Sequence, residues 1–452
     1  MDFTLETNKI SFLPRFYRLS FVAALSNMMV PLAGICDTAF LGHLRDIKPL
    51  AGVILASILF DYLYRILKFL RNSTNAMTAE AVGKNDSQEI ILAGLRSGSI
   101  AIAIALLILL LQYPIQKLGF AILSGAQDIE ASGIEYFNAR IWGAPAVLLN
   151  FVLIGWFLGK EKNSFVLSIS LIANGSNILF DYLAIYRWGW ESYGAGLATA
   201  FSQYLALFVA LLGVAFSINW QDFSFAIKKI GERKSLQEAI SFKFNILVRF
   251  IALISAYSIF TNISATIGTN LLTENGLLLQ IALLSQFTIQ GVGMTTQTLT
   301  ANFKGKGEHQ KMIPLLIAAI GTSLVVSLTF ALSVILFPQT IFALFTNHVD
   351  INREIVNYST WLLPLLAFTA IAFMLEGYFI GLKQSTVLRN ASLIAFFLVF
   401  LPLAMHASNT RSINLLWFSL TSYMLTLIFV LTIQIFPIQK TINLSQVSEA
   451  DS

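Results

Sequence analysis

The chain has 452 residues, of which 56% are hydrophobic and 12% are charged, and its formal net charge is +5. A soluble domain carries about 25% charged residues, so this composition excludes a soluble globular protein and indicates an integral membrane protein. Cys36 is the only cysteine in the sequence, which excludes an intrachain disulfide framework.

Twelve apolar stretches of about 20 residues or more suit helices that cross a hydrocarbon core of about 30 Å. They predict an all-α integral membrane fold with twelve transmembrane helices. In chain order these spans lie near 16–42, 50–82, 88–112, 129–159, 163–186, 192–216, 238–268, 274–303, 311–336, 351–381, 384–407 and 412–436.

The longest basic connection between these spans is 217–237, which we interpret as a linker between two halves of six helices each. The predicted domains are therefore an N-lobe (1–216), a cytoplasmic linker (217–237), a C-lobe (238–436) and a C-terminal tail (437–452).

The distribution of Lys and Arg predicts the orientation of the chain. If both termini lie inside, 18 of the 29 basic residues fall in the inside termini, loops and their edges, 6 fall in outside loops, and 5 fall within spans. Cytoplasmic loops carry the excess of positive charge, so we expect a multi-pass protein of the inner (plasma) membrane with both termini in the cytoplasm. The net positive charge then reflects topology and anionic lipid, not nucleic-acid binding.

The second half of the sequence repeats the first. GWFLGKEKN, which begins at Gly155, recurs as GYFIGLKQS from Gly377, and TAEAVGKND, which begins at Thr78, recurs as TANFKGKGE from Thr300. The interval between the two copies is the same in both pairs and is close to half of the chain. Parallel repeats of this kind are common in transporters whose site lies between two lobes, so we expect two pseudo-symmetric six-helix lobes.

The two halves differ in their acidic residues. Asp37 in the first span and Asp181 in the fifth have no acidic counterparts near Ile263 or Phe400. A charge at mid-membrane costs roughly 2.5–3.5 kcal/mol on insertion scales, so it needs a reason to persist. Both acids lie five or six residues before the expected outer ends of their helices, hence at similar depth. Two carboxylates at one depth can share a proton or a sodium ion. We therefore expect any chemistry that depends on membrane-embedded acids to lie in the N-terminal half.

Neutral polar residues fall at the same depth. Asn177 lies one helical turn below Asp181 on the same face, and Tyr136 and Thr199 lie near the outer ends of the fourth and sixth spans. Their oxygens would suit Na⁺ or a protonated acid. Thr and Tyr are also common contacts between membrane helices, so these residues alone leave the roles of Tyr136 and Thr199 open, and each acid could instead be hydrogen-bonded within its own bundle.

Pro31 lies in the first span, six residues before Asp37. Proline removes one backbone hydrogen bond and favours a kink. This kink is either static or a hinge that bends when the neighbouring acid is protonated.

The second span carries a polar face of Asp61, Arg65, Lys68 and Asn72, with Arg71 just beside it. The spacing i, i+4, i+7 and i+11 places the first four on one side of a helix. Such a face lines a water-filled cavity or a helix contact rather than lipid. An internal ion pair between Asp61 and Arg65 is the alternative interpretation.

The second half carries an uncharged polar face, formed by Gln286 and Gln290 of the eighth span with Asn262 of the seventh. We expect both polar faces to line a cavity. Glu376, near the inner end of the tenth span, is expected to be structural. The sequence contains no Walker, zinc or nucleophile-elbow motif. We therefore expect a secondary transporter and not an enzyme, with no cofactor other than H⁺ or Na⁺ as coupling ion.

Five segments resemble the multidrug and toxic compound extrusion (MATE) family, and the resemblance covers nearly the whole chain. They are LAGICDTAFLGHL (32–44), FLRNSTNAMTAEAVGKND (69–86), GWFLGKEKNS (155–164), NILFDYLAIYRWGWESYGAGLATAFSQY (177–204) and EGYFIGLKQS (376–385). The FLR–T–TAEA stretch and the two N-lobe acids resemble the DinF-like branch most. The stretch FLRNSTNAMTAEA departs from the branch, which usually has more Gly and a Gln there, and Asn72, Asn75 and Glu80 are expected to alter the polarity of the cavity.

The resemblance implies the twelve-helix, two-lobe fold of the MOP superfamily, a central cavity, and export driven by H⁺ or Na⁺. It also implies an ion-coupling site at Asp37, Asn177, Asp181 and Thr199, where Na⁺ is possible, with Tyr136 as a further match.

The function expected from the sequence is a cation-coupled multidrug antiporter that works by alternating access as a monomer. It would export lipophilic, amphipathic and mainly cationic compounds, with membrane lipids as its other partners. We favour H⁺ over Na⁺ because Pro31 next to Asp37 offers a proton-controlled bend. A lipid-linked oligosaccharide flippase of the same superfamily is the alternative, supported by Arg65, Lys68 and Arg71. An integral membrane lipid enzyme would need a nucleophile or metal cluster that the sequence does not reveal.

Overall fold

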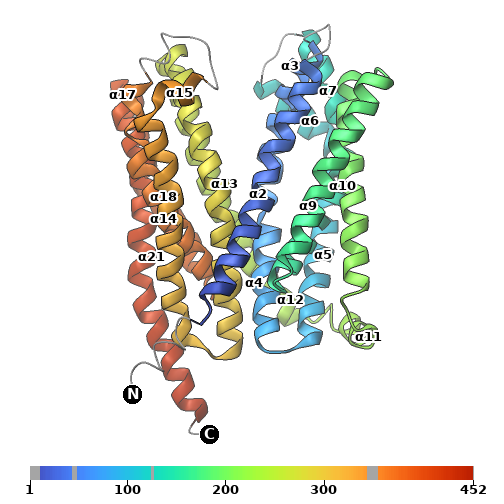
Figure 1. Ribbon diagram of the computed structural model, residues 1–452, viewed down its shortest axis with the longest axis vertical. Helices are drawn as coiled ribbons and strands as arrows, with labels where there is room; N and C mark the ends of the chain where they lie inside the picture. Colours follow the sequence, from blue (N-terminus) through green and yellow to red (C-terminus); the bar gives the residue numbers. More distant parts are fainter. Residues whose placement is uncertain (1–10, 43–47, 124–126, 344–354, 451–452) are drawn as a thin grey trace. The chain divides into compact units, whose positions relative to one another are not determined.

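The computed structural model describes residues 11–42, 48–123, 127–343 and 355–450, and these fold almost entirely as helices (Figure 1). Side chains are described at these positions except 30–42, 233–235, 269–270, 339, 342–343, 357 and 439–450. The described part of the chain contains no β-strand. The predicted all-α membrane fold is therefore confirmed.

Eleven helical stretches in the described ranges are long and apolar enough to cross a membrane, and they coincide with the last eleven predicted spans. The helix α2 (Leu13–Gly42), with 30 residues, occupies the place of the first. The largest difference is at the tenth span, which is predicted from 351 but begins at Leu362. The polar stretch before it forms a separate short helix, α17 (Val356–Ser359), followed by a turn.

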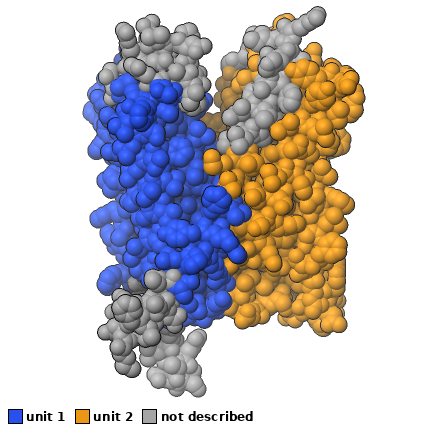
Figure 2. All heavy atoms as spheres, viewed as in Figure 1, with its two compact units in different colours: residues 1–24, 242–452 blue, residues 25–241 orange. Residues whose placement is uncertain are grey.

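The chain divides into two compact units, residues 25–241 and residues 1–24 with 242–452 (Figure 2). After α2, the first unit contains α3 (Lys48–Leu67), α4 (Phe69–Gly83), α5 (Ser87–Leu110), α6 (Gln112–Leu123), α7 (Gln127–Arg140), α8 (Ala144–Gly159), α9 (Asn163–Asp181), α10 (Glu191–Ala215) and α11 (Trp220–Lys228). The remaining helices are α12 (Arg233–Ile267), α13 (Thr269–Lys306), α14 (Met312–Leu336), α15 (Pro338–Ala343), α17, α18 (Leu362–Gly381), α19 (Ser385–Ile394), α20 (Leu401–Thr410) and α21 (Ile413–Ala450).

The start of α2 packs with the second half of the chain, although the sequence groups it with the first. The rings of Phe12 and Phe303 pack edge to face with their centroids 5.9 Å apart. Arg15 donates a hydrogen bond to the side-chain oxygen of Asn302 at 3.1 Å. The predicted domain division at the linker remains a prediction, but these contacts assign residues 11–24 to the compact unit that contains α13.

The sequence repeat is also a repeat of helix contacts. In the first unit α4 packs against α8, and in the second α13 packs against α18. A Cβ at Gly155 would lie 2.3 Å from the carbonyl oxygen of Arg71, and one at Gly377 would lie 2.5 Å from that of Gly293. Gly377 and Gly293 are the counterparts of Gly155 and Arg71 in the sequence repeat. Glycine is thus needed at equivalent places because two helix backbones touch there.

The turns between helices follow the same repeat. Three pairs of residues at corresponding positions of the two halves adopt the left-handed backbone region. They are Asn85 (φ 56°) with Gly307 (φ 73°), Glu161 (φ 58°) with Lys383 (φ 60°), and Gly189 (φ 67°) with Arg411 (φ 50°). Non-glycine residues visit this region infrequently, so its recurrence shows that both halves use one backbone plan.

The predicted linker contains a helix, α11, that docks on its own unit. Asn219 caps α11 by accepting a hydrogen bond from the backbone N–H of Gln221 at 3.0 Å. Ala226 is buried against Ile91 and Leu92 of α5. The linker therefore begins as an ordered amphipathic helix held against the first unit.

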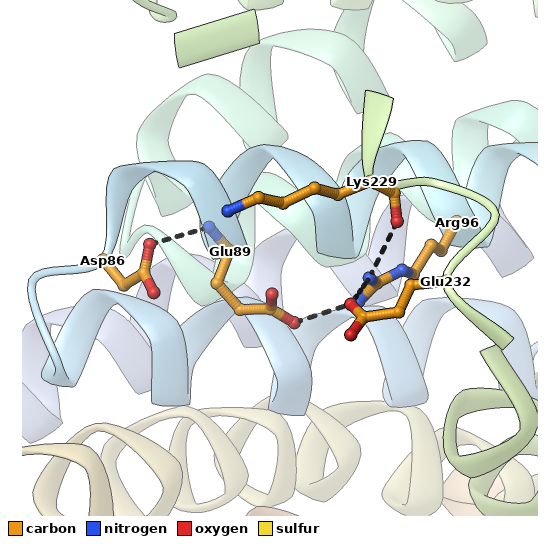
Figure 3. Close-up of polar contacts among 5 residues, drawn as sticks. All are labelled: Asp86, Glu89, Arg96, Lys229 and Glu232. Atoms are coloured by element: carbon orange, nitrogen blue, oxygen red, sulfur yellow. Dashed lines mark hydrogen bonds and ion pairs between the residues drawn. The ribbon is translucent and has the colours of Figure 1, made fainter. Parts of the chain in front are cut away.

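A buried arginine holds the end of this linker (Figure 3). Arg96 of α5 is 3% exposed, contacts Glu89 at 3.3 Å and Glu232 at 3.6 Å, and donates to the carbonyl oxygen of Lys229 at 3.2 Å. Asp86 caps the same helix by accepting from the backbone N–H of Glu89 at 2.9 Å. Arg96 thus joins the start of α5 to the segment after α11.

Candidate functional site

Asp181 is a fully buried carboxylate at the end of α9, with 0% of its surface exposed. Asn177, one turn earlier, donates from Nδ2 to Asp181 Oδ2 at 3.0 Å. This is the contact that the i, i+4 spacing predicts. The chain continues directly after Asp181 as a π-helical turn, Tyr182–Arg187. Such turns are rare and are often found at functional sites.

Tyr136 lies on α7 and is also buried. Its hydroxyl accepts a hydrogen bond from Arg140 Nη1 at 2.6 Å and one from Ser57 Oγ at 3.4 Å. The Arg140 guanidinium lies over the ring of Phe60, with its Cζ 4.6 Å from the ring centroid. Arg140 is not among the residues predicted from the sequence, although an arginine four residues after Tyr136 inside a predicted span is a usable signal.

Thr199 lies on α10, which packs against both α9 and α7. Its hydroxyl donates to the carbonyl oxygen of Ala195 at 3.0 Å, which leaves the oxygen lone pairs available as acceptors. A Cβ at Gly196 would lie 2.6 Å from the carbonyl oxygen of Tyr136. The helix that carries Thr199 therefore touches the backbone at Tyr136.

Asp37 and Pro31 lie in α2, which is helical across both positions. Their side chains are outside the described ones. The pairing of Asp37 with Asp181, and the hinge at Pro31, therefore remain predictions.

The polar face of the second span lies on α3 and α4, which are separated at Lys68. Asp61 is exposed, and Arg65 and Lys68 are half-buried. Among the described residues Asp61 and Arg65 form no ion pair, so that alternative interpretation is wrong. The two charges lie on the polar face without being joined to each other.

The α4 part of this region is buried. Asn72, the last member of the polar face, is 8% exposed. Next to it, Arg71 is also 8% exposed and donates from Nη1 to Asn27 Oδ1 of α2 at 3.2 Å. Arg71 therefore places a guanidinium inside the first unit, between α4 and α2.

The uncharged polar face of the other unit lies on α12 and α13. Gln286 is half-buried and donates from Nε2 to the hydroxyl of Tyr257. Gln290 is half-buried one turn later, and Asn262 is exposed. The structure joins Gln286 to α12 through Tyr257 rather than through Asn262.

The second unit contains buried acids as well. Glu376 of α18 receives two hydrogen bonds from Arg249 of α12, one of them from Nε to Oε1 at 2.8 Å. This pairing supports the structural role expected for Glu376. Glu274, near the start of α13, is completely buried. Glu274 is the first residue of the predicted eighth span, an end position where an acid does not by itself indicate burial.

Comparison with known proteins adds independent evidence about the family to which the chain belongs. A family model described as MatE matches residues 23–183 and again residues 246–405. The two matches fall in corresponding parts of the two halves, which agrees with the internal repeat. Together they cover more than half of the chain.

Individual relatives align over most of their length. DNA damage-inducible protein F of Escherichia coli is 26% identical over 411 residues, which are 90% of this chain and 88% of that protein. The multidrug export protein MepA of Staphylococcus aureus is 23% identical over 370 residues, 80% of this chain and 79% of that protein. A solved structure of a multidrug resistance MATE family transporter in an outward-facing conformation has a TM-score of 0.84 at 19% identity, over 94% of this chain and 95% of that one.

Proposed function

Because the chain belongs to the MatE family of multi-pass membrane proteins, we propose that it is a cation-coupled multidrug antiporter. It exports lipophilic, mainly cationic compounds and admits H⁺, or alternatively Na⁺, in exchange. In this proposal it works by alternating access in the inner membrane, with both termini in the cytoplasm.

The buried pair of Asp181 and Asn177 supports this proposal most strongly. A carboxylate with 0% exposure in a membrane helix is costly unless it serves a purpose. Asn177 is a suitable partner for an acid that titrates, because its amide has both a donor and an acceptor. It donates to the carboxyl oxygen Oδ2 of Asp181 at 3.0 Å. After a rotation of the amide it can accept from the protonated acid.

The ion-coupling role extends to the residues around this pair. Thr199 Oγ1 keeps acceptor lone pairs because its proton is used within α10. Tyr136 receives a strong hydrogen bond from Arg140, which orients its hydroxyl. We propose that Asp37 completes the site and that the bend at Pro31 follows its protonation. The same oxygens would hold Na⁺ if sodium were the coupling ion.

The exchange of drug for proton follows because binding of one ligand weakens binding of the other. An ionised acid pair favours a cationic drug, and proton entry removes that charge and weakens drug binding. Such coupling is reciprocal, since drug binding must weaken proton binding by the same factor. The affinity for a permanently charged dye should therefore fall as the pH is lowered.

The proposal is tested with purified protein in liposomes loaded with rhodamine 6G, a lipophilic cation. We expect an inward proton gradient to accelerate dye efflux in the wild type and to have no effect in Asp181→Asn or in protein-free liposomes. Acceleration by an inward Na⁺ gradient alone would reassign the ion, and no response to either gradient would refute coupled transport.

A further inference from the structure

Arg71 is a buried cation whose hydrogen bonds are incomplete. Nη1 donates to Asn27, but Nε and Nη2 are buried and have no hydrogen-bond partner among the described residues. A buried charged donor without a partner is strongly unfavourable. The structure therefore contains donors that call for an acceptor which the described protein does not supply.

Two further cations precede Arg71 in the second predicted span. Arg65 and Lys68 precede Arg71 by six and three residues, and both are half-buried. Lys68 lies within electrostatic range of Arg65 and Arg71, which repel it, and of the acid Asp61, which attracts it. Arg65 has no ion pair with Asp61, the acid on this face. The three cations thus form a basic subsite (Arg65, Lys68 and Arg71) within one unit.

The close contact between α4 and α8 does not require these charges. At the corresponding positions of the repeat, Arg65 is replaced by Phe287, Lys68 by Gln290 and Arg71 by Gly293. The equivalent helix α13 nevertheless makes the equivalent close contact with α18. Because one half forms this packing without any of the three cations, the packing of these two helices does not explain their presence in the other half.

We propose that the basic subsite binds the anionic group of an amphipathic ligand, namely a carboxylate, sulfonate or phosphate. The two donors of Arg71 that lack partners, Nε and Nη2, present the planar fork that binds two oxygens of such a group. Lys68 and Arg65 add positive charge beside it. The inference rests on the proposed function and extends its substrate class from lipophilic cations to compounds that also carry a negative group.

The test uses two dyes that differ only in a carboxylate. Rhodamine 6G is an ethyl ester and a cation, and rhodamine 19 is the same dye with a free carboxylate. Binding of each is measured by fluorescence polarisation with the protein in phosphatidylcholine nanodiscs. We expect Arg71→Gln to weaken binding of rhodamine 19 about tenfold, as for a charged hydrogen bond, and to change binding of rhodamine 6G less than about twofold.

Two more variants keep the test decisive. Lys68→Gln, at a half-buried position, should also weaken the binding of rhodamine 19 and not that of rhodamine 6G. It supplies the test if Arg71→Gln does not fold. Lys117→Gln, which removes an exposed charge on α6, serves as the matched control and should affect neither dye. Equal effects on both dyes, or no effect on rhodamine 19, would overturn the subsite.

The source of the anionic group is distinguished by the lipid. If the occupant is a phospholipid headgroup, nanodiscs containing phosphatidylglycerol should weaken rhodamine 19 binding in the wild type but not in Arg71→Gln. If phosphatidylglycerol has no effect, the dye's own carboxylate is the ligand. Provided that Arg71→Gln weakens binding of rhodamine 19 selectively, the lipid result only identifies the source of the anionic group. Gradient-driven efflux of rhodamine 6G, measured on the same protein, tests the proposed antiport separately.

Discussion

Asp181 combines full burial with a titratable group and a hydrogen bond to Asn177. Replacing it with Asn keeps the volume of the side chain but removes the charge and the proton site. We expect Asp181→Asn to lower gradient-driven dye efflux at least tenfold while the protein stays folded. Asp37→Asn should act similarly, and the double variant should be little worse than either single variant because the acids serve one site. Fully additive losses would indicate two separate sites.

Arg249 and Glu376 form a buried ion pair between α12 and α18. Removing one partner of such a pair leaves a buried charge uncompensated, which costs about 3–5 kcal/mol. We expect Glu376→Gln to lower the midpoint of thermal unfolding in detergent clearly. The double variant Arg249→Met with Glu376→Leu should recover much of the loss because both charges are gone.

Glu308→Gln is the control for this pair, since Glu308 is partly exposed and pairs with Lys311 within one helical turn. It should change the midpoint very little. If Glu376→Gln also left the midpoint unchanged, the pair would have no structural role and Glu376 would become a candidate transport residue.

At the scale of helices, the contact between α4 and α8 depends on the absence of a side chain at Gly155. A Cβ there would lie 2.3 Å from a backbone oxygen, so the two helices would have to separate. We expect Gly155→Ala to destabilise the protein by about 1–3 kcal/mol, as overpacked sites do. Gly98→Ala on α5 is the matched control, because nothing lies within 4 Å of its Cβ position. Equal unfolding midpoints for the two variants would contradict this account.

The linker helix α11 is held to α5 by Arg96 and by the apolar cluster around Ala226. We expect Arg96→Gln to increase hydrogen exchange of backbone amides in 217–237, because the bond to the carbonyl oxygen of Lys229 and the charge opposite Glu232 are both lost. Glu232→Gln should have a smaller effect, since that side chain is 61% exposed. Unchanged exchange in Arg96→Gln would mean that the apolar cluster alone holds the linker.

At the scale of the whole chain, hydrophobic run length predicted the spans well, because a membrane helix must satisfy its backbone internally over a fixed thickness. The repeat that contains Gly155 and Gly377 predicted two similar halves, and the structure shows an equivalent close helix contact at both glycines. The grouping of residues 11–24 with the second half was not predictable, because it depends on contacts of Phe12 and Arg15 with α13, far away in the sequence.

The candidate site was predictable only where its contacts are local. The bond between Asn177 and Asp181 follows from their spacing on one helix. The bond between Arg249 and Glu376 joins two helices that are far apart in the sequence, and no periodic signal pairs them. Arg71 illustrates the same limit, because its missing partners become evident only when its neighbours are known.

In the proposed antiport, proton entry and drug exit are one coupled event at the N-lobe acids. Because coupling is reciprocal, a dye gradient should move protons without any imposed pH gradient. Liposomes containing the protein, rhodamine 6G and the pH indicator pyranine are diluted into dye-free buffer of equal pH, with the membrane potential clamped by potassium and valinomycin.

Coupled antiport predicts that the interior acidifies as dye leaves wild-type liposomes and that it does not acidify with Asp181→Asn. Protein-dependent dye efflux without a change of internal pH would contradict it.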